Sequence, residues 1–237
     1  MLILLASATP LMAGDAPWIA KPGRDRTWHS EHQKLVQRAR KGDVSIYLLG
    51  DSITAHWTST GRAIWHLDLL PLKSACFGVS ADRVENILYR ITHGGLPEVG
   101  PKLYVLMLGT NNLAQSEANE PAEVVRGIKT VVATIRKRHP SSKILLLSIL
   151  PNGKDPEHKL RKTILATNRQ LATLDDGDSI HYADVHDQFL GKDGKWLAGL
   201  TSDGTHLTSR GYERPYSLIR KPLHQLSRGR LPAAEDH

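Results

Sequence analysis

The stretch Ser45-Ile46-Tyr47-Leu48-Leu49-Gly50-Asp51-Ser52-Ile53-Thr54 decides how the rest of the chain is interpreted. Its apolar, partly β-branched run stops at Gly50-Asp51-Ser52, which predicts a buried strand ending in a tight turn that displays the Ser52 hydroxyl. Open α/β folds bind ligands at such strand-to-helix turns, where the N–H groups of the next helix favour negative charge. Ser52 is therefore a candidate nucleophile, although Gly-Asp-Ser is also ordinary turn composition.

Strands and helices alternate on both sides of this stretch. Apolar runs predict further strands at residues 75–78, 103–108, 144–150 and 180–185. Helical spacing predicts helices at residues 27–41, from 82 to about 91, at 119–138, at 160–174 and after 208. The second of these opens with Asp82 and Glu85, a pair typical of a capping box with Asp82 as the cap. The alternation predicts a three-layer α/β/α fold with a mostly parallel five-stranded sheet.

Polar residues follow two of the predicted strands and fill one late loop. The strand at 103–108 ends in Gly109-Thr110-Asn111-Asn112, much as the first strand ends at Ser52. Because successive parallel strands end on one edge of a sheet, Asn111 and Ser52 are expected to meet there. Asp203 and His206 lie three residues apart in a turn-rich loop, a spacing at which one side chain can orient the other.

Composition limits the class of protein. The chain has 237 residues, 40% of them hydrophobic, which suits one domain, placed at residues 27–228 with a tail at 229–237. Its net charge of +7 is spread over several predicted helix faces without aromatic partners, so a solvated basic surface is preferred to nucleic-acid binding. The single cysteine, Cys76, excludes an internal disulfide and a multi-cysteine zinc cluster, and it is interpreted as a packed thiol.

The N-terminal residues are similar to a signal peptide. An apolar run at 2–13 is followed by small residues through Ala16, although a positively charged start is missing. We interpret residues 1–16 as a leader and expect a secreted or periplasmic protein; the alternative is a cytoplasmic protein with a flexible leader. The run is shorter than the ~20 residues that a membrane-spanning helix needs, so no integral membrane protein is expected.

Four short blocks, in order, resemble those of the SGNH, or GDSL, hydrolase family: Gly50-Asp51-Ser52, the turn at 78–82, Gly109-Thr110-Asn111-Asn112 and Asp203-Gly204-Thr205-His206. The flanking residues are similar to the branch that contains the catalytic subunits of intracellular platelet-activating-factor acetylhydrolase and bacterial relatives. The resemblance covers residues 27–226. It implies a flavodoxin-like sheet and a homodimer like those of the branch. No cofactor and no metal are expected, because no cluster of histidines or carboxylates outside these blocks has the spacing of metal ligands.

The resemblance also implies a role for each matching residue. Ser52 would be the nucleophile, His206 the general base and then acid, and Asp203 the group that fixes the imidazole. The oxyanion hole would consist of the backbone N–H of Ser52, the side-chain amide of Asn111 and the backbone N–H of Ala81. These are the parts that a serine hydroxyl needs in order to attack an ester.

Further residues are expected near the substrate or depart from the family pattern. We expect Asp51, Gly78 and Trp196 to contribute to substrate binding, with Trp196 as a wall of a sugar site. The family usually has glycine where this chain has Ala81; alanine serves as well unless the turn requires a positive φ, which would cost ~1 kcal/mol or more. Pro215 is expected to kink or delay the last helix.

The leading hypothesis is a metal-independent serine esterase that cleaves short acyl, above all acetyl, esters through an acyl-enzyme intermediate. The expected export favours a carbohydrate O-acetylesterase. One alternative is a phospholipid acyl or acetyl hydrolase of the platelet-activating-factor type. Another is a carbohydrate-binding relative without activity, an idea motivated by Ala81.

Overall fold

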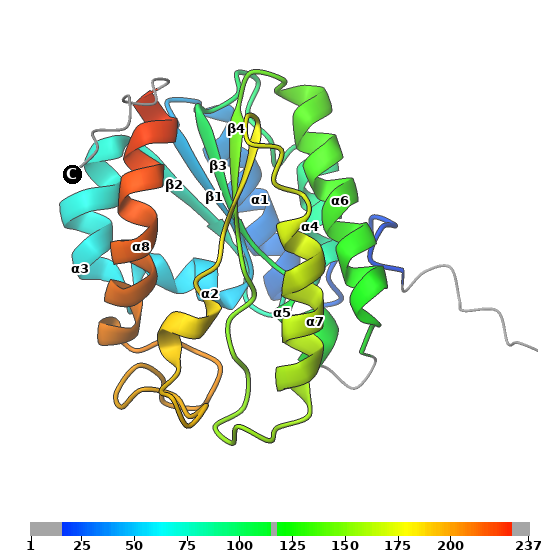
Figure 1. Ribbon diagram of the computed structural model, residues 1–237. Helices are drawn as coiled ribbons and strands as arrows, with labels where there is room; N and C mark the ends of the chain where they lie inside the picture. The colour runs from blue at the N-terminus through cyan, green and yellow to red at the C-terminus, as the bar shows by residue number, and fades with distance from the viewer. Residues whose placement is uncertain (1–15, 115–117, 229–237) are drawn as a thin grey trace, which may run out of the picture.

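Five parallel strands form the middle layer of the structure, a computed structural model that describes residues 16–114 and 118–228 (Figure 1). The order across the sheet is β2-β1-β3-β4-β5, and every neighbouring pair is parallel. Apolar residues dominate the strands because helices cover both faces. The predicted α/β/α fold is confirmed, with strands at β1 Ile46–Gly50, β2 Ser74–Gly78, β3 Leu103–Met107, β4 Lys143–Leu147 and β5 Ile180–Ala183.

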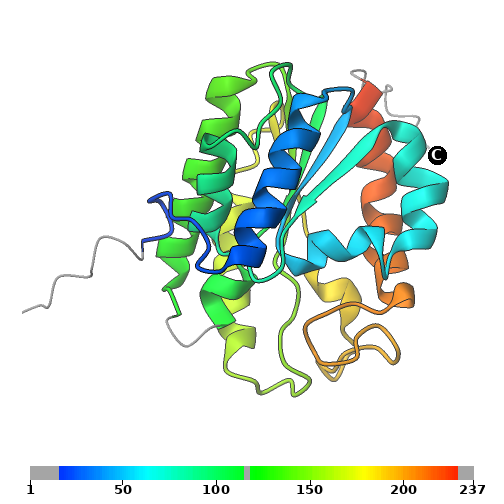
Figure 2. The ribbon, with the colours of Figure 1, turned by 180° about the vertical axis from the view of Figure 1, so that it is seen from behind.

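Four long helices cover one face of this sheet. Figure 2 shows α1 in front of the sheet from this side. Alternate strand residues such as Tyr47, Leu49 and Leu106 pack against this layer in one buried cluster. The helices are α1 Arg26–Arg40, α4 Val84–Thr92, α6 Pro121–Arg138 and α7 Leu160–Ala172.

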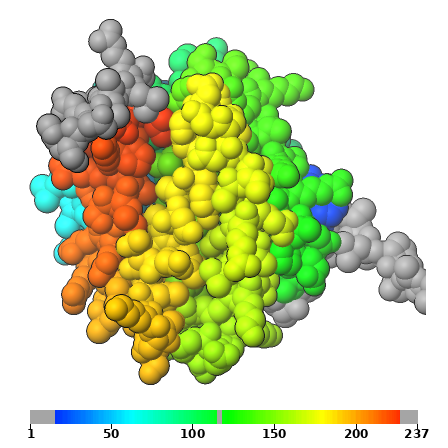
Figure 3. Space-filling view, in the orientation of Figure 1, coloured from blue at the N-terminus to red at the C-terminus, as the bar shows by residue number. Residues whose placement is uncertain are grey.

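The opposite face is covered by α8 Ser209–Arg228 and by short helical turns between β1 and β2. The intervening strand residues, such as Leu48 and Val105, pack against this second layer. α8 is one helix that includes Pro215 and Pro222, so the expected delay of its start by Pro215 is not observed. On the surface in Figure 3, β5 lies between α8 and α7, and its residues are only half-buried. The short turns are α2 Ser52–Ala55, η1 His56–Thr58, α3 Arg62–Ile64, η2 Trp65–Leu69 and η3 Leu70–Leu72.

The segment before α1 also packs against the domain, ahead of the predicted domain start at 27. The Arg126 guanidinium lies 3.9 Å from the centre of the Trp18 ring. The Lys21 N–H donates to the Glu85 carbonyl at 3.1 Å. The predicted leader, apart from Ala16, and the predicted tail lie outside the described residues. Within 16–114 and 118–228, no helix has the length and apolar character to cross a membrane.

The start of α4 differs from the prediction. Asp82 does not cap the helix; Arg83 precedes it, and its N–H donates to the Asn86 side chain at 2.9 Å. The Val84 N–H donates to Oδ1 of the buried Asn112 at 2.8 Å. The predicted cap is therefore wrong. The Asp82 carboxylate binds Arg90, and the side chain of Asn112, 28 residues after Val84, accepts an N–H at the start of the helix instead.

Candidate active site

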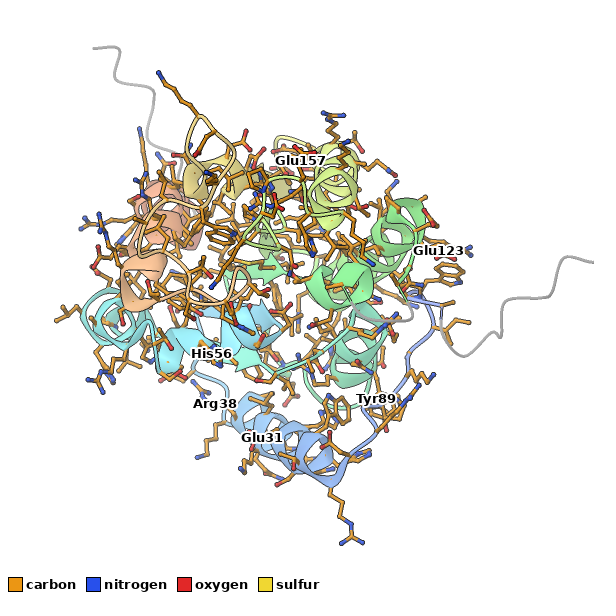
Figure 4. The ribbon with its side chains drawn as sticks, turned by 90° about the horizontal axis from the view of Figure 1, so that it is seen from below. Glu31, Arg38, His56, Tyr89, Glu123 and Glu157 are labelled. Atoms are coloured by element: carbon orange, nitrogen blue, oxygen red, sulfur yellow. The ribbon has the colours of Figure 1, made fainter. Side chains whose placement is uncertain are left out.

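The carboxyl ends of the strands form one edge of the sheet, onto which Figure 4 looks, and Ser52 lies there as the first residue of α2. The Asp51 side chain caps this helix, because its Oδ1 accepts the Ile53 N–H at 2.9 Å. Gly50 leaves no room for a side chain, since an added Cβ would lie 2.1 Å from Thr54 Oγ1. These local features make the turn tight and leave the Ser52 side chain partly exposed.

The Ser52 hydroxyl meets an imidazole that is 154 residues away in sequence. Ser52 Oγ lies 3.0 Å from His206 Nε2, and His206 Nδ1 lies 2.7 Å from Asp203 Oδ2. The carboxylate therefore binds one ring nitrogen and the hydroxyl binds the other. In a neutral ring this arrangement places the proton on Nδ1 and leaves Nε2 free to accept the serine proton.

Hydrogen bonds within the loop hold Asp203 in this position. Asp203 Oδ1 accepts the backbone N–H groups of Thr205 at 2.8 Å and of His206 at 2.7 Å. Partial burial opposes ionisation of the carboxyl, but the bonds from the His206 side chain and from these N–H groups outweigh it and lower the pKa of Asp203 to about 2. The carboxylate is thus charged at neutral pH.

A second histidine lies next to this group. The rings of His56 and His206 are 5.6 Å apart between centroids, and His56 lies at the strand-end edge in Figure 4. Burial and, to a smaller extent, the proximity of His206 lower the pKa of His56. A neutral His56 adds no positive charge to the site.

Asn111 and Ala81 lie on neighbouring turns of the same edge. The Asn111 Nδ2 donates to the Asp82 carbonyl at 2.8 Å, which orients the amide and engages one of its two hydrogens. Ala81 is exposed and has φ of +63°, in the left-handed region. The turn does require a positive φ, which is the condition under which alanine is strained.

Asp51 and Gly78 have structural contacts in this arrangement. Burial raises the pKa of Asp51 to about 7, with the nearby Asp82 charge adding to the effect and the Ile53 N–H bond opposing it. An added Cβ at Gly78 would lie 2.2 Å from the backbone nitrogen of Ala55, so glycine permits β2 to approach α2. Contact of either residue with substrate stays a prediction.

Trp196 lies on the loop that leads to Asp203, and its indole is held by the protein. Trp196 Nε1 donates to the Gly153 carbonyl at 3.1 Å, and the ring packs edge-on against Phe189 with centroids 5.5 Å apart. The ring is half-buried. A role of Trp196 as a wall of a sugar site also stays a prediction.

The turn after β4 supports the histidine loop and was missed from the sequence. The Gly153 N–H donates to the Gly204 carbonyl at 2.9 Å, and Asn152 Nδ2 donates to Thr205 Oγ1 at 3.0 Å. The buried Arg161 donates from Nε to the Asn152 carbonyl at 3.0 Å and from Nη2 to the Gly153 carbonyl at 2.7 Å. The available signal was Leu150-Pro151-Asn152-Gly153, a third polar turn at the end of an apolar run.

No group of three or more metal-binding side chains is assembled within residues 16–114 and 118–228. The chemistry that this edge offers is a hydroxyl, a base, a charged carboxylate and adjacent N–H donors. Those groups suit attack on an ester carbonyl.

Comparison with known proteins identifies the family of the chain. The sequence pattern of the GDSL-like lipase/acylhydrolase family matches residues 48–214. The alpha2 subunit of platelet-activating factor acetylhydrolase IB from Homo sapiens is 30% identical over 204 residues, covering 86% of this chain and 84% of that protein. In fold, a GDSL-like lipase from Bacteroides thetaiotaomicron matches with a TM-score of 0.67 and 20% identity over 84% of this chain and 97% of that one.

A variant of an acetyl xylan esterase from Geobacillus stearothermophilus shares the fold at a TM-score of 0.59, with 13% identity over 80% of this chain and 96% of that one. The family match spans more than half of the chain, and it agrees with the resemblance inferred from the four sequence blocks. The chain belongs to the GDSL-like lipase/acylhydrolase family and is a carboxylic ester hydrolase.

Proposed function

We propose that this hydrolase removes short acyl groups, above all acetyl groups, from esters by means of a Ser52 acyl-enzyme. The observation that carries the proposal is the chain of contacts from Ser52 Oγ through both nitrogens of His206 to Asp203. Such a chain makes a serine hydroxyl nucleophilic at neutral pH.

The proposal assigns a group to each step of the reaction. Ser52 Oγ attacks the ester carbonyl while His206 Nε2 accepts the serine proton, and the Asp203 carboxylate stabilises the imidazolium. The tetrahedral intermediate collapses, the C–O bond to the alcohol breaks, and His206 returns the proton to the departing oxygen. Water then attacks the acyl-serine with the same base, which releases the carboxylic acid and restores Ser52.

The oxyanion of both intermediates needs donors that are fixed before reaction. The proposal assigns the backbone N–H groups of Ser52 and Ala81 and the second amide hydrogen of Asn111 to this task. All three come from turns at the same strand edge, and Asn111 is already oriented by its bond to the Asp82 carbonyl.

The alcohol part of the substrate is proposed to be polar, as in an acetylated carbohydrate. Exposed large apolar side chains favour lipid binding. The exposed large apolar residues in the described part of the chain are Ile19, Leu67, Leu70, Val99, Leu165 and Leu218. None of these six lies on a turn that directly follows the carboxyl end of a strand. The second candidate is an acetyl phospholipid, favoured by the name of the relative at 30% identity. Export and a homodimeric state stay predictions from the sequence.

The first experiment measures hydrolysis of p-nitrophenyl acetate, butyrate and octanoate in the presence of a chelator. Wild type, Ser52→Ala and the control Ser59→Ala are compared; Ser59 is exposed seven residues further on. We expect activity that falls from acetate to octanoate, is abolished in Ser52→Ala and is unchanged in Ser59→Ala. Full activity of Ser52→Ala would remove the assigned nucleophile.

A second assay identifies the alcohol. Acetate release from acetylated xylan is compared with release from an acetyl phospholipid, at equal ester concentration. Faster release from the polysaccharide supports the carbohydrate assignment, and faster release from the phospholipid replaces it with the second candidate.

A further inference from the structure

We propose that the buried ion pair between Arg90 and Asp82 positions the active site: it fixes the three proposed oxyanion donors relative to one another. This inference rests on the proposed function, because it concerns donors assigned there. Neither side chain is within reach of solvent: Arg90 is 2% exposed and Asp82 is 1% exposed.

The Asp82 carboxylate is fully engaged by groups from two helices. Arg90 Nε donates to Asp82 Oδ2 at 2.7 Å, and Nη2 of the same guanidinium lies 2.6 Å from that oxygen. Trp28 Nε1, from α1, donates to the other oxygen at 2.6 Å. Two elements that are far apart in sequence thus hold one residue of the turn between β2 and α4.

The same guanidinium reaches the ends of two strands. Arg90 Nη1 donates to the carbonyl of Phe77 at 3.0 Å, and Nη2 donates to that of Gly50 at 3.2 Å. Phe77 is near the end of β2, four residues before Ala81, and Gly50 ends β1, two residues before Ser52. One planar group therefore links the turn of Ser52 to the turn of Ala81.

The main chain of Asp82 completes the link to the third donor. Its carbonyl accepts the Asn111 amide at 2.8 Å, and its nitrogen is adjacent to Ala81. The Ala81 turn itself is held in a left-handed conformation that alanine rarely adopts. Each of the three donors is thus linked to the ion pair. The Ser52 N–H is two residues from Gly50, whose carbonyl binds Arg90. Ala81 directly precedes Asp82, and the Asn111 amide binds the Asp82 carbonyl.

The chemistry of the pair favours positioning over stability alone. A buried ion pair gives up the hydration of two charges, and replacement of such pairs by apolar side chains is often neutral or stabilising. A guanidinium, however, presents five donors in a rigid plane, so it can bind a carboxylate and two carbonyls at once. Lysine carries the same charge but offers a single nitrogen, which cannot span these acceptors.

The test compares Arg90→Lys with wild type in p-nitrophenyl acetate hydrolysis, with KM, kcat and urea denaturation measured for each. Displacement of the donors is expected to lower kcat about 100-fold, because a misplacement of ~1 Å has effects of that size, while KM changes little. Tyr104→Phe is the control: it removes a buried 2.7 Å bond to His139 away from the strand-end edge. It should lower stability and leave kcat unchanged.

The decisive readout is the coupling between Arg90 and a donor. If both act through one oxyanion hole, Arg90→Lys should cost far less kcat in an Asn111→Ala background than in wild type. A purely structural pair would give independent, multiplicative losses, or lower stability with kcat unchanged; either result overturns the inference.

If Arg90→Lys does not fold, Trp28→Phe provides the same test, since it removes only one donor from the Asp82 carboxylate. A lower kcat at unchanged KM, coupled to Asn111→Ala, is expected, and an unchanged kcat refutes the inference. Ser52→Ala is assayed in parallel. Activity in that variant refutes the proposed function, whereas an inactive Ser52→Ala together with a fully active Arg90→Lys refutes only the positioning role.

Discussion

Ala81→Gly should stabilise the protein, because it removes the backbone strain of a non-glycine residue with positive φ and loses little side-chain packing. Ala81 has φ of +63°, and its methyl group is exposed, so little packing is lost. The left-handed conformation costs a non-glycine residue ~1–2 kcal/mol. Glycine also makes the unfolded chain more flexible, which opposes the gain by ~0.4–1 kcal/mol. The net expectation is a stabilisation of ~0.5–1 kcal/mol.

Urea denaturation and thermal melting measure this effect, and a gain of that size corresponds to a rise in Tm of ~1–4 °C for a domain of this length. Lys73→Gly is the control, because Lys73 has φ of +55° but precedes β2, at the opposite edge of the sheet. It also loses an exposed ion pair with Asp43, so its gain should be smaller.

Activity separates strain from distortion. Since the turn already has the left-handed conformation with alanine, the direction of the Ala81 N–H should not change, and kcat of Ala81→Gly should stay within about twofold of wild type. A variant less stable than wild type would refute the strain argument. A large increase in kcat would show instead that alanine distorts the oxyanion hole.

Three other substitutions test the site. Burial raises the pKa of Asp51 to about 7, so the folded protein keeps a proton that the unfolded chain loses near pH 4. The free energy of unfolding of the wild type should therefore fall from pH 4 to 7. Above pH 7, Asp51→Asn should have a free energy of unfolding up to ~4 kcal/mol higher than that of the wild type, measured by urea denaturation. Equal stability of the two proteins at pH 8 would contradict this. Asn111→Ala should lower kcat ~100-fold with little change in KM, and an unchanged kcat would remove it from the oxyanion hole. Trp196→Phe should lower kcat about tenfold by loosening the Gly153 turn, whereas a rise in KM for acetylated xylan alone would make Trp196 a substrate wall.

Local patterns in the sequence were sufficient for the layers of the fold. The run from Ile46 to Gly50 and the apolar periodicity of the stretch 121–138 predict a strand and a helix that the structure contains as β1 and α6. Such patterns predict these elements because they depend only on residues close together in the chain. A strand buried on both faces needs a continuous apolar run, and a helix that covers a sheet needs one apolar stripe. The enzyme class followed from four short blocks in order, and the family match confirms it.

The prediction that Asp82 caps a helix failed because its side chain has partners far along the chain. Asp82 looked like a helix cap from its neighbours alone, yet its carboxylate binds Trp28 and Arg90, and the Val84 N–H is taken by Asn112. The same sequence pattern is compatible with either arrangement. Only the approach of α1 and of the turn after β3 decides between them.

The sequence by itself determined that a serine and an amide would follow strand ends in this protein and that an Asp-His pair would lie in a turn-rich loop, because strand and turn preferences act over a few residues. The tertiary structure decided that Ser52 Oγ and His206 Nε2 lie 3.0 Å apart and that Ala81 takes a positive φ. It also decided that Arg90 joins the turns around them. These facts depend on how the layers pack, since contacts between residues far apart in the chain are set by the burial of whole helix and sheet faces rather than by local preference.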